Sequence, residues 1–409
     1  MNSSYSRVLA ISLIIILGGC AGVQQHTPVP AALSSTATVT GFSPSIRFWA
    51  DEPPPNLDEA VSQVIAQYTA VYGDYYRAHG HYPTLNYLSI SAGAGNGAFG
   101  AGLLSGWSAT GHRPDFAIVS GVSAGALIAP FVFVGPEYDR KLKQLFTQPE
   151  APNLISISSF GVMKGLMGGD ALSDASLLAE EIRENITPDL VAKIAAEDRK
   201  GKRLLIATTN IEAQRGVLWN IGEIANSGNP KAVDLIRQIV LASVSVPGVI
   251  KPVLISVVAG GKHYDEMHAD GGLVSQETLY PIQMQKRINT AFVSRGLERR
   301  LYVIRDSKVT PEYEVTQPKL FPIAFRSIET ITKYQGIGDL YRLYLMSKRD
   351  HIDYNLSYIP DNFSVPSNQL FDPHYMSALF DVGYSMGMKG DKIWQKIPPN
   401  IEFVPDGRP

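Results

Sequence analysis

The segment from Gly121 to Gly125 reads Gly-Val-Ser-Ala-Gly and fits the pattern G-x-S-x-G. In hydrolases this pattern forms a nucleophile elbow, a sharp turn from a strand into a helix that presents a serine hydroxyl. The hydroxyl of Ser123 is then expected at a helix N-terminus, where free N–H groups and the helix dipole favour a developing oxyanion. Residues 116–119 are strand-like and residues 124–133 are helix-like, which is the context that the elbow needs. The pattern therefore favours a nucleophilic serine over a purely structural turn.

A glycine-rich segment, residues 92–102, lies between a predicted strand and a predicted helix. Its unpaired backbone N–H groups would form a concave array suited to an anion. One use is to bind a dinucleotide pyrophosphate, because Gly95–Gly100 matches G-x-G-x-x-G and the acidic Asp115 follows about 20 residues later. Another is an oxyanion hole beside Ser123, since neighbouring parallel strands end at one sheet edge. A shared acyl-transfer site explains both loops at once, and a glycine-rich turn without a ligand is the third interpretation.

A serine nucleophile needs a proton acceptor within hydrogen-bond reach. The chain has eight histidines, and none carries a local signature that singles it out. Asp270-Gly271-Gly272 offers a carboxylate at the predicted end of a strand, followed by glycines that permit close backbone approach. On its own, Asp-Gly is more typical of a turn.

The N-terminus predicts a targeting signal. Arg7 precedes an apolar run from Val8 to Leu17, which is too short for the roughly 20 residues that span a bilayer. Small residues then precede Cys20, the one cysteine of the chain, as in the lipobox of bacterial lipoproteins. We expect a signal peptide over 1–19, an acylated Cys20 and a flexible tether over 20–40. The alternative is an ordinary secretory signal peptide. No aspartate follows Cys20, which favours the outer membrane, with the protein facing the periplasm.

Composition and patterning predict a globular α/β protein. The formal net charge is −2, so no basic field exists to attract nucleic acid. A single cysteine excludes a disulfide framework and cysteine-built metal sites. Alternation of strands and helices predicts a mostly parallel central sheet covered on both faces. Predicted helices are 57–77, 101–107, 124–133, 172–186, 190–196, 232–244, 323–346 and 373–388; predicted strands are 85–90, 116–119, 203–208, 217–220, 251–258 and 301–304.

Together these segments resemble the patatin-like phospholipases, which are serine acyl hydrolases with a Ser-Asp dyad and no catalytic histidine. The family's Gly-Gly-Gly-x-Arg-Gly oxyanion loop is similar to Ala92–Gly97, with Asn96 in the arginine position and Gly97 in that of the last glycine. Its G-x-S-x-G and Asp-Gly-Gly blocks are similar to Gly121–Gly125 and Asp270–Gly272, and Ala242–Pro247 resembles the segment that precedes the latter. Residues 208–215 and 217–220, and Phe371-Asp372-Pro373, resemble further segments of bacterial members.

The resemblance implies a three-layer α/β/α fold with Ser123 as nucleophile and Asp270 as proton acceptor. It also implies that no metal or organic cofactor is required. Membrane lipids are then expected as substrate and as anchor surface, and the oligomeric state is not predicted. The expected domain plan has a helical extension over 41–84, a catalytic core over 85–285, and a strand and helical extension of the same domain over 286–409. The implied oxyanion hole is Gly93, Ala94, Gly95, Asn96 and Gly97; Gly121 and Gly125 shape the elbow, and Gly271 and Gly272 complete the Asp-Gly-Gly motif.

Two alternatives stay open from the sequence. The first is an α/β-hydrolase with a Ser-His-Asp triad, in which a late histidine such as His351 or His374 serves as the base. The second is a catalytically weak lipid-binding lipoprotein, because Ala92, Ala94 and Asn96 depart from the family's oxyanion loop.

Overall fold

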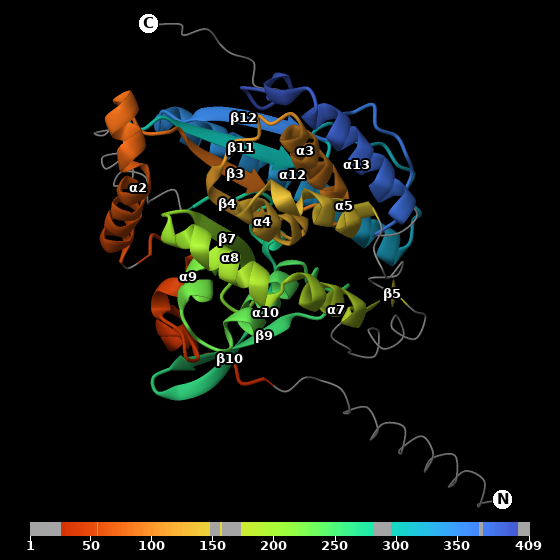
Figure 1. Cartoon of the computed structure of the whole chain (residues 1–409). Coiled ribbons are helices and arrows are strands. Elements are labelled where there is room, and N and C mark those ends of the chain that lie inside the picture. Colours follow the sequence, from red (N-terminus) through yellow and green to blue (C-terminus); the bar gives the residue numbers. More distant parts are fainter. Residues whose placement is uncertain are drawn as a thin grey trace, which may run out of the picture.

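A computed structural model describes residues 26–54, 56–147, 156–157, 173–280, 296–367 and 371–399 (Figure 1). A ten-stranded sheet crosses the molecule in the order β1-β9-β10-β7-β4-β3-β11-β12, with β8 paired to β7 and β2 paired to β8. A separate pair joins β5 (Ser156–Ile157) to β6 (Ser173–Asp174). The strands of the large sheet are β1 Thr38–Val39, β2 Arg47–Trp49, β3 Leu85–Ile90, β4 Phe116–Val122, β7 Arg203–Asn210, β8 Arg215–Asn220, β9 Val253–Ala259, β10 Lys262–Asp270, β11 Arg299–Arg305 and β12 Asp353–Tyr358.

The helices cover both faces of this sheet, which confirms the predicted three-layer α/β/α class. The α-helices are α2 Leu57–His79, α3 Gly97–Ala109, α4 Ala124–Val134, α5 Asp139–Thr147, α7 Ser176–Asn185, α8 Pro188–Arg199, α9 Ile221–Asn226, α10 Ala232–Ser243, α12 Leu320–Arg349 and α13 Pro373–Gly387. Short 3-10 helices are η1 Ala31–Thr36, η2 Pro44–Ile46, η3 Ala94–Asn96, η4 Pro136–Tyr138, η5 Gly271–Leu273 and η7 Gly390–Ile393.

The side chains of β3 show how the two faces separate. Leu88 and Ile90 point into a core built with α3, α4, α5, α8, α10 and α13. Leu85 and Tyr87 lie on the other face of the strand and point into a second core built with α2 and α12. This period of two is what a strand buried on both faces requires. In Figure 1, α2 lies at the left edge of the molecule and α12 lies behind the sheet.

The sheet is mixed, and therefore less parallel than expected. Strands β12, β11, β3, β4 and β7 are parallel neighbours. Beyond β7 the pairing is antiparallel, because β7–β8 and β9–β10 are hairpins. Their tight turns contain Gln214, Gly260 and Gly261, all with positive φ. The parallel half is the part that carries the serine elbow, since Ser123 directly follows β4.

The glycine-rich segment is a loop over a shorter stretch than predicted. The expected helix start at Ala101 is wrong, because α3 begins at Gly97 and includes the glycines that follow. These glycines serve close packing: a Cβ at Gly102 or Gly106 would lie 2.1 or 2.2 Å from a backbone oxygen of α13. The helix tolerates the glycines because packing against α13 outweighs their low propensity.

The expected flexible tether does not extend to residue 40. His26 Nε2 lies 2.9 Å from Glu212 Oε1, and Pro28 forms a bridge with Asp265. Val39 is buried, and its strand β1 pairs antiparallel with β9. Hydrogen bonding to an open sheet edge therefore orders this Pro/Ser/Thr-rich stretch in spite of its composition. The signal segment 1–19 and Cys20 lie outside the described residues.

Both predicted extensions contribute to the central sheet. The 41–84 extension holds β2 as well as the helix α2, and β2 pairs with β8. The C-terminal extension supplies β11 and β12, which continue the parallel set beyond β3. Within the described ranges, no helix combines the length and the apolar character needed to cross a membrane.

Candidate active site

The elbow at Ser123 has the backbone that the sequence pattern predicts. Ser123 has a φ of +52°, which lies in a region of backbone conformation that residues other than glycine seldom adopt. A Cβ at Gly121 would lie 2.3 Å from the carbonyl oxygen of Gly125, and one at Gly125 would lie 2.3 Å from that of Ile90. The Ser123 amide donates to Ser243 Oγ at 3.0 Å, which fixes the strained turn from the end of α10. Neither elbow glycine has room for a side chain, so both positions require glycine.

The structure brings the predicted nucleophile, Ser123, and its predicted proton acceptor, Asp270, together. Ser123 Oγ donates a hydrogen bond to Asp270 Oδ2 at 2.7 Å, although the two residues are distant in sequence. The second carboxylate oxygen accepts from the amide of Gly272 at 2.7 Å. The Asp270 amide donates to the carbonyl of Ser245 at 2.9 Å, so residues 243–245 hold both partners. Both side chains are buried, which shields the pair from bulk water.

The surroundings of Asp270 make it a better base than an ordinary carboxylate. Burial raises its pKa from 3.8 to about 6, while the hydrogen bonds from Ser123 and Gly272 act in the opposite direction. No cation forms an ion pair with Asp270 among the described residues. A carboxylate that is desolvated and still ionised at neutral pH is suited to accept a proton from a serine hydroxyl.

We expect kcat/KM to fall about tenfold for each pH unit below about 6, because only the ionised form of Asp270 accepts the serine proton. Above this value the rate is expected to level off. The measurement is a pH–rate profile between pH 4.5 and 8 with a soluble ester. A rate that stays nearly level from pH 8 down to pH 4.5, as expected for the usual aspartate pKa near 4, would contradict a buried carboxylate as the base.

The glycine loop supplies fewer free amides than predicted. The amides of Asn96 and Gly97 already donate to carbonyls within the loop, which removes them from the expected oxyanion hole. The amides of Gly93, Ala94 and Gly95 have no acceptor among the described residues. These are the donors that remain for an oxyanion. Ala94 lines a small cavity together with Ser123, and its φ of +47° is unusual for a residue with a side chain.

Two side chains hold this loop in place. Asn96 Oδ1, which stands in the family's arginine position, accepts a hydrogen bond from Tyr375 Oη of α13 at 2.6 Å. Asp306, directly after β11, accepts from the amide of Gly100 at 2.9 Å. Asp306 was not predicted as a site residue, because no local motif marks it. A Cβ at Gly93 would lie 2.7 Å from the Asp306 backbone oxygen, so the loop requires glycine there.

The described residues offer no histidine partner to the dyad. All eight histidines fall within the described ranges, and none forms a hydrogen bond with Ser123 or Asp270. His268 is buried, but its ring nitrogens contact Thr208 Oγ1 at 2.9 Å and Glu266 Oε2 at 3.1 Å. The geometry thus differs from a Ser-His-Asp triad built on His351 or His374. Asp115, considered above as a cofactor-binding acid, forms an ion pair with Lys202 at 2.5 Å.

Cavities lead to the serine from two sides. A cavity of about 10 Å³ lies against Ser123 and is otherwise lined by apolar residues, including Leu127 and Phe371. Leu127 and Phe371 also line a neighbouring apolar cavity of about 40 Å³. On the other side, Ala94 and Val246 are shared with an open groove of about 840 Å³, which we call the entry groove. The site therefore joins a wide entrance, lined by both polar and apolar residues, to a narrow apolar interior.

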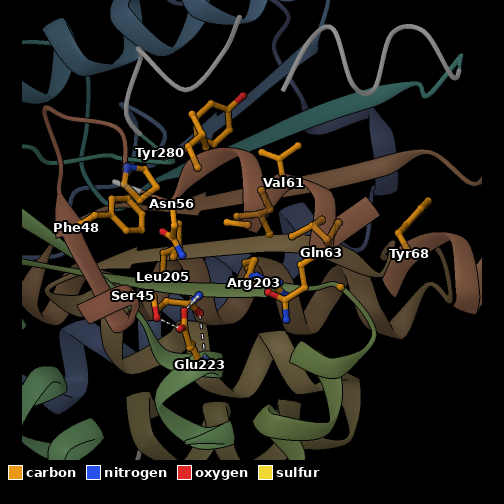
Figure 2. Close-up of a pocket in the computed structure, with 18 of the residues that line it drawn as sticks. Ser45, Phe48, Asn56, Val61, Gln63, Tyr68, Arg203, Leu205, Glu223 and Tyr280 are labelled. Atoms are coloured by element: carbon orange, nitrogen blue, oxygen red, sulfur yellow. Dashed lines mark hydrogen bonds between the residues drawn. The ribbon is translucent and has the colours of Figure 1, made fainter. Parts of the chain in front are cut away.

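A separate apolar cavity of about 160 Å³ lies between α2 and the sheet (Figure 2). Its walls include Val61 and Tyr68 of α2, and Ile118 and Arg203 near the first residues of β4 and β7. Ser123 follows the opposite end of β4, roughly 16 Å farther along the strand. This cavity is therefore not part of the Ser123 site.

A comparison with known protein families gives a match over the part of the chain that holds Ser123 and Asp270. The sequence pattern of the family described as patatin-like phospholipase matches residues 88–281. Residues 88–281 are a patatin-like phospholipase domain. This patatin-like domain contains the glycine loop, Ser123 and Asp270, and it indicates a lipid acyl hydrolase. It leaves β11, α12, β12 and α13 outside the matched range, although these elements complete the same sheet and layers.

Among solved structures, the crystal structure of VipD from Legionella pneumophila is similar to this chain at 12% identity and a TM-score of 0.35. The match covers 76% of this chain and 67% of that one. No curated protein matches the chain by sequence.

Proposed function

We propose that this protein is a membrane-anchored serine acyl hydrolase of the phospholipase or lysophospholipase type, which works through a Ser123–Asp270 dyad. The observation that carries the proposal is the 2.7 Å hydrogen bond from Ser123 Oγ to Asp270 Oδ2 at the N-terminus of α4. The patatin-like domain supports ester bonds of lipids as the substrate class.

The first step forms an acyl-enzyme. Ser123 Oγ attacks the ester carbonyl carbon while its proton passes to Asp270 Oδ2. The carbonyl oxygen becomes an oxyanion, and the free amides of Gly93, Ala94 and Gly95 are the proposed donors to it. Loss of one such donor typically costs about 10²–10³ in kcat. When the tetrahedral intermediate collapses, protonated Asp270 returns its proton to the departing alcohol oxygen.

The second step releases the acid and restores the enzyme. A water molecule gives its proton to Asp270 as its oxygen attacks the acyl carbon. The carbon–Oγ bond then breaks, and Ser123 recovers the proton from Asp270. The Gly272 amide, which donates to the other carboxylate oxygen, keeps Asp270 in one orientation through both steps. The narrow apolar cavities beyond Ser123 suit the first carbons of an acyl chain, and the open entry groove suits the rest of the lipid.

The proposed anchor is a lipid on Cys20, which fixes the enzyme to the bacterial outer membrane on its periplasmic side. The support is the sequence alone: an apolar run, small residues and the sole cysteine. Tethering would raise the concentration of the enzyme at the surface that carries its substrate. Mass spectrometry of the protein purified from membranes tests this, because an unmodified Cys20 would contradict the anchor.

The test of the hydrolase is covalent labelling with a fluorophosphonate, together with fatty-acid release from phospholipid, lysophospholipid and short-chain esters. We expect one phosphonyl group on Ser123 and release from at least one ester class, with both lost in Ser123→Ala. No labelling and no release, while the folded protein binds lipid, would instead support the catalytically weak lipid-binding protein.

A double variant, His351→Ala with His374→Ala, separates the dyad from a triad. Both imidazoles lie outside the hydrogen bonds of Ser123 and Asp270, so activity is expected to change less than about twofold. Loss of activity in a folded double variant would favour the Ser-His-Asp alternative over the dyad.

A further inference from the structure

Helix α12 has two halves with different environments. All of its buried residues lie between Gly336 and Ser347, in the second half. The first half has none, yet it carries large apolar side chains, and the segment before it adds Tyr313 and Val315. The exposed apolar residues, with relative exposure from 43% to 77%, are Leu320, Phe321, Ile323, Phe325, Ile328, Ile331 and Tyr334. A contiguous apolar patch of this kind on a soluble protein marks an interaction site.

The two cations of this half, Arg326 and Lys333, face the protein. Lys333 Nζ donates to the carbonyl of Thr310 at 2.8 Å and pairs with Glu312 at 2.7 Å. Arg326 bonds to the carbonyl of Glu312 and pairs with Glu329 at 3.0 Å. These contacts hold the polar stripe against the segment that leads from β11 into α12.

The apolar residues lie on the opposite side of the helix. Arg326, Glu329 and Lys333 are spaced by three and four positions and form one stripe. At 100° per residue, Leu320 and Ile331 fall on the far side of the helix from that stripe. A surface helix normally turns its apolar face to the core. Here the arrangement is inverted, so the apolar face lacks a partner within the described part of the chain.

The point where the two halves of α12 meet lies beside the candidate active site. Gln335 donates to the carbonyl of Leu273 at 3.2 Å, and Asp339 accepts from the amide of Gln276 at 2.7 Å. Both contacts join α12 to the segment that directly follows Asp270-Gly271-Gly272. Ile328 and Tyr334 also line the entry groove, as do Gly93 and Ala94 of the oxyanion loop. Leu273 and Val274, themselves exposed, extend the apolar surface toward Asp270.

We propose that the apolar face of residues 320–334, together with Leu273 and Val274, docks on a lipid surface and delivers lipids through the entry groove to Ser123. The proposal rests on the proposed function for the identity of the substrate. Two features favour a lipid surface: the patch is continuous with the mouth of a lipid-hydrolysing site, and its cations, Arg326 and Lys333, already pair with carboxylates. Docking is therefore driven by apolar contact and depends little on salt.

The test is flotation with phosphatidylcholine vesicles. The full chain carries Cys20→Ser, so that no acyl chain on residue 20 contributes to binding. In this background Ile323→Asp with Ile331→Asp is expected to lower the vesicle partition coefficient at least about tenfold, since two carboxylates enter the docking face. Hydrolysis of a soluble monomeric ester is expected to stay within about twofold, because neither side chain lines the dyad or the groove.

Val71→Asp is the matched control, since it also places a carboxylate at an exposed apolar position, on α2. It is expected to leave vesicle binding unchanged. Equal binding of the double variant and the Cys20→Ser chain would overturn the proposal. So would a dimer of the Cys20→Ser chain that the double variant converts to monomer without loss of vesicle binding. If the Cys20→Ser chain hydrolyses no ester, the proposed function fails, and vesicle partition still decides the docking face independently.

Discussion

Asp270→Asn is expected to lower kcat by at least about 10³-fold and to make the folded protein more stable at neutral pH. The loss of activity follows because an amide cannot take the proton of Ser123, although it preserves the shape of the carboxylate. The Asn side-chain oxygen can still accept from the Gly272 amide, so the local fold is retained.

The gain in stability follows from the raised pKa of Asp270. Because the folded protein binds the proton more tightly than the unfolded chain, this group favours folding below about pH 3.8, and that contribution is lost as the pH rises through about 6. The rise from 3.8 to about 6 corresponds to a cost of about 3 kcal/mol for the ionised, buried carboxylate, at 1.4 kcal/mol per pH unit. Asparagine carries no charge, so Asp270→Asn removes this cost.

Urea unfolding of the wild type and of Asp270→Asn at pH 8 and at pH 4.5 measures the effect. We expect a gain of about 1–3 kcal/mol at pH 8 and a much smaller difference at pH 4.5, where wild-type Asp270 is protonated. A variant that is less stable than the wild type at pH 8 would show that the carboxylate holds the elbow together. That result would contradict the idea that the protein loses folding stability by keeping an ionised, buried carboxylate as its catalytic base.

The sequence predicted the parts of the site that local rules determine. The G-x-S-x-G elbow at Ser123 appears with its predicted flanking strand and helix, because strain and glycine spacing are encoded within five residues. Strand β3 also matches its predicted bounds, Leu85–Ile90. Helix α2 ends at His79 and is capped by Gly80, which adopts the left-handed conformation. The pairing of Ser123 with Asp270 needed the resemblance to a family, since no rule of periodicity connects residues so far apart.

Long-range contacts determine what the sequence did not reveal. β10 alternates weakly in hydrophobicity, because Glu266 and His268 are buried among polar partners, including Arg47. β12 has a similarly mixed sequence and is stabilised by its pairing with β11. Asp306 carries no local motif, and it is the sheet that brings it to the amide of Gly100 in α3. From the sequence alone, the apolar residues in the first half of α12 would be assigned to a face that packs on the core. Only the position of the helix in the fold shows that they face solvent.

The packing of α3 against α13 leads to the second large effect. Each helix has a pair of glycines four residues apart, Gly102 and Gly106 on α3 and Gly383 and Gly387 on α13. A Cβ at any of them would lie within 2.1–2.3 Å of a backbone oxygen of the other helix. The helices therefore touch backbone to backbone, and a methyl group cannot be accommodated by a change of rotamer.

Gly102→Ala is accordingly expected to lower the free energy of unfolding by at least about 3 kcal/mol, although alanine is the better helix former. The matched control is Gly338→Ala on α12, where an added Cβ has nothing within 4 Å and the backbone φ is not positive. There the same substitution is expected to stabilise by about 0.5–1 kcal/mol. Urea midpoints of the two variants are therefore predicted to move in opposite directions. Similar shifts would mean that intrinsic helix propensity dominates, whereas opposite shifts would show that the backbone contact between α3 and α13 outweighs it.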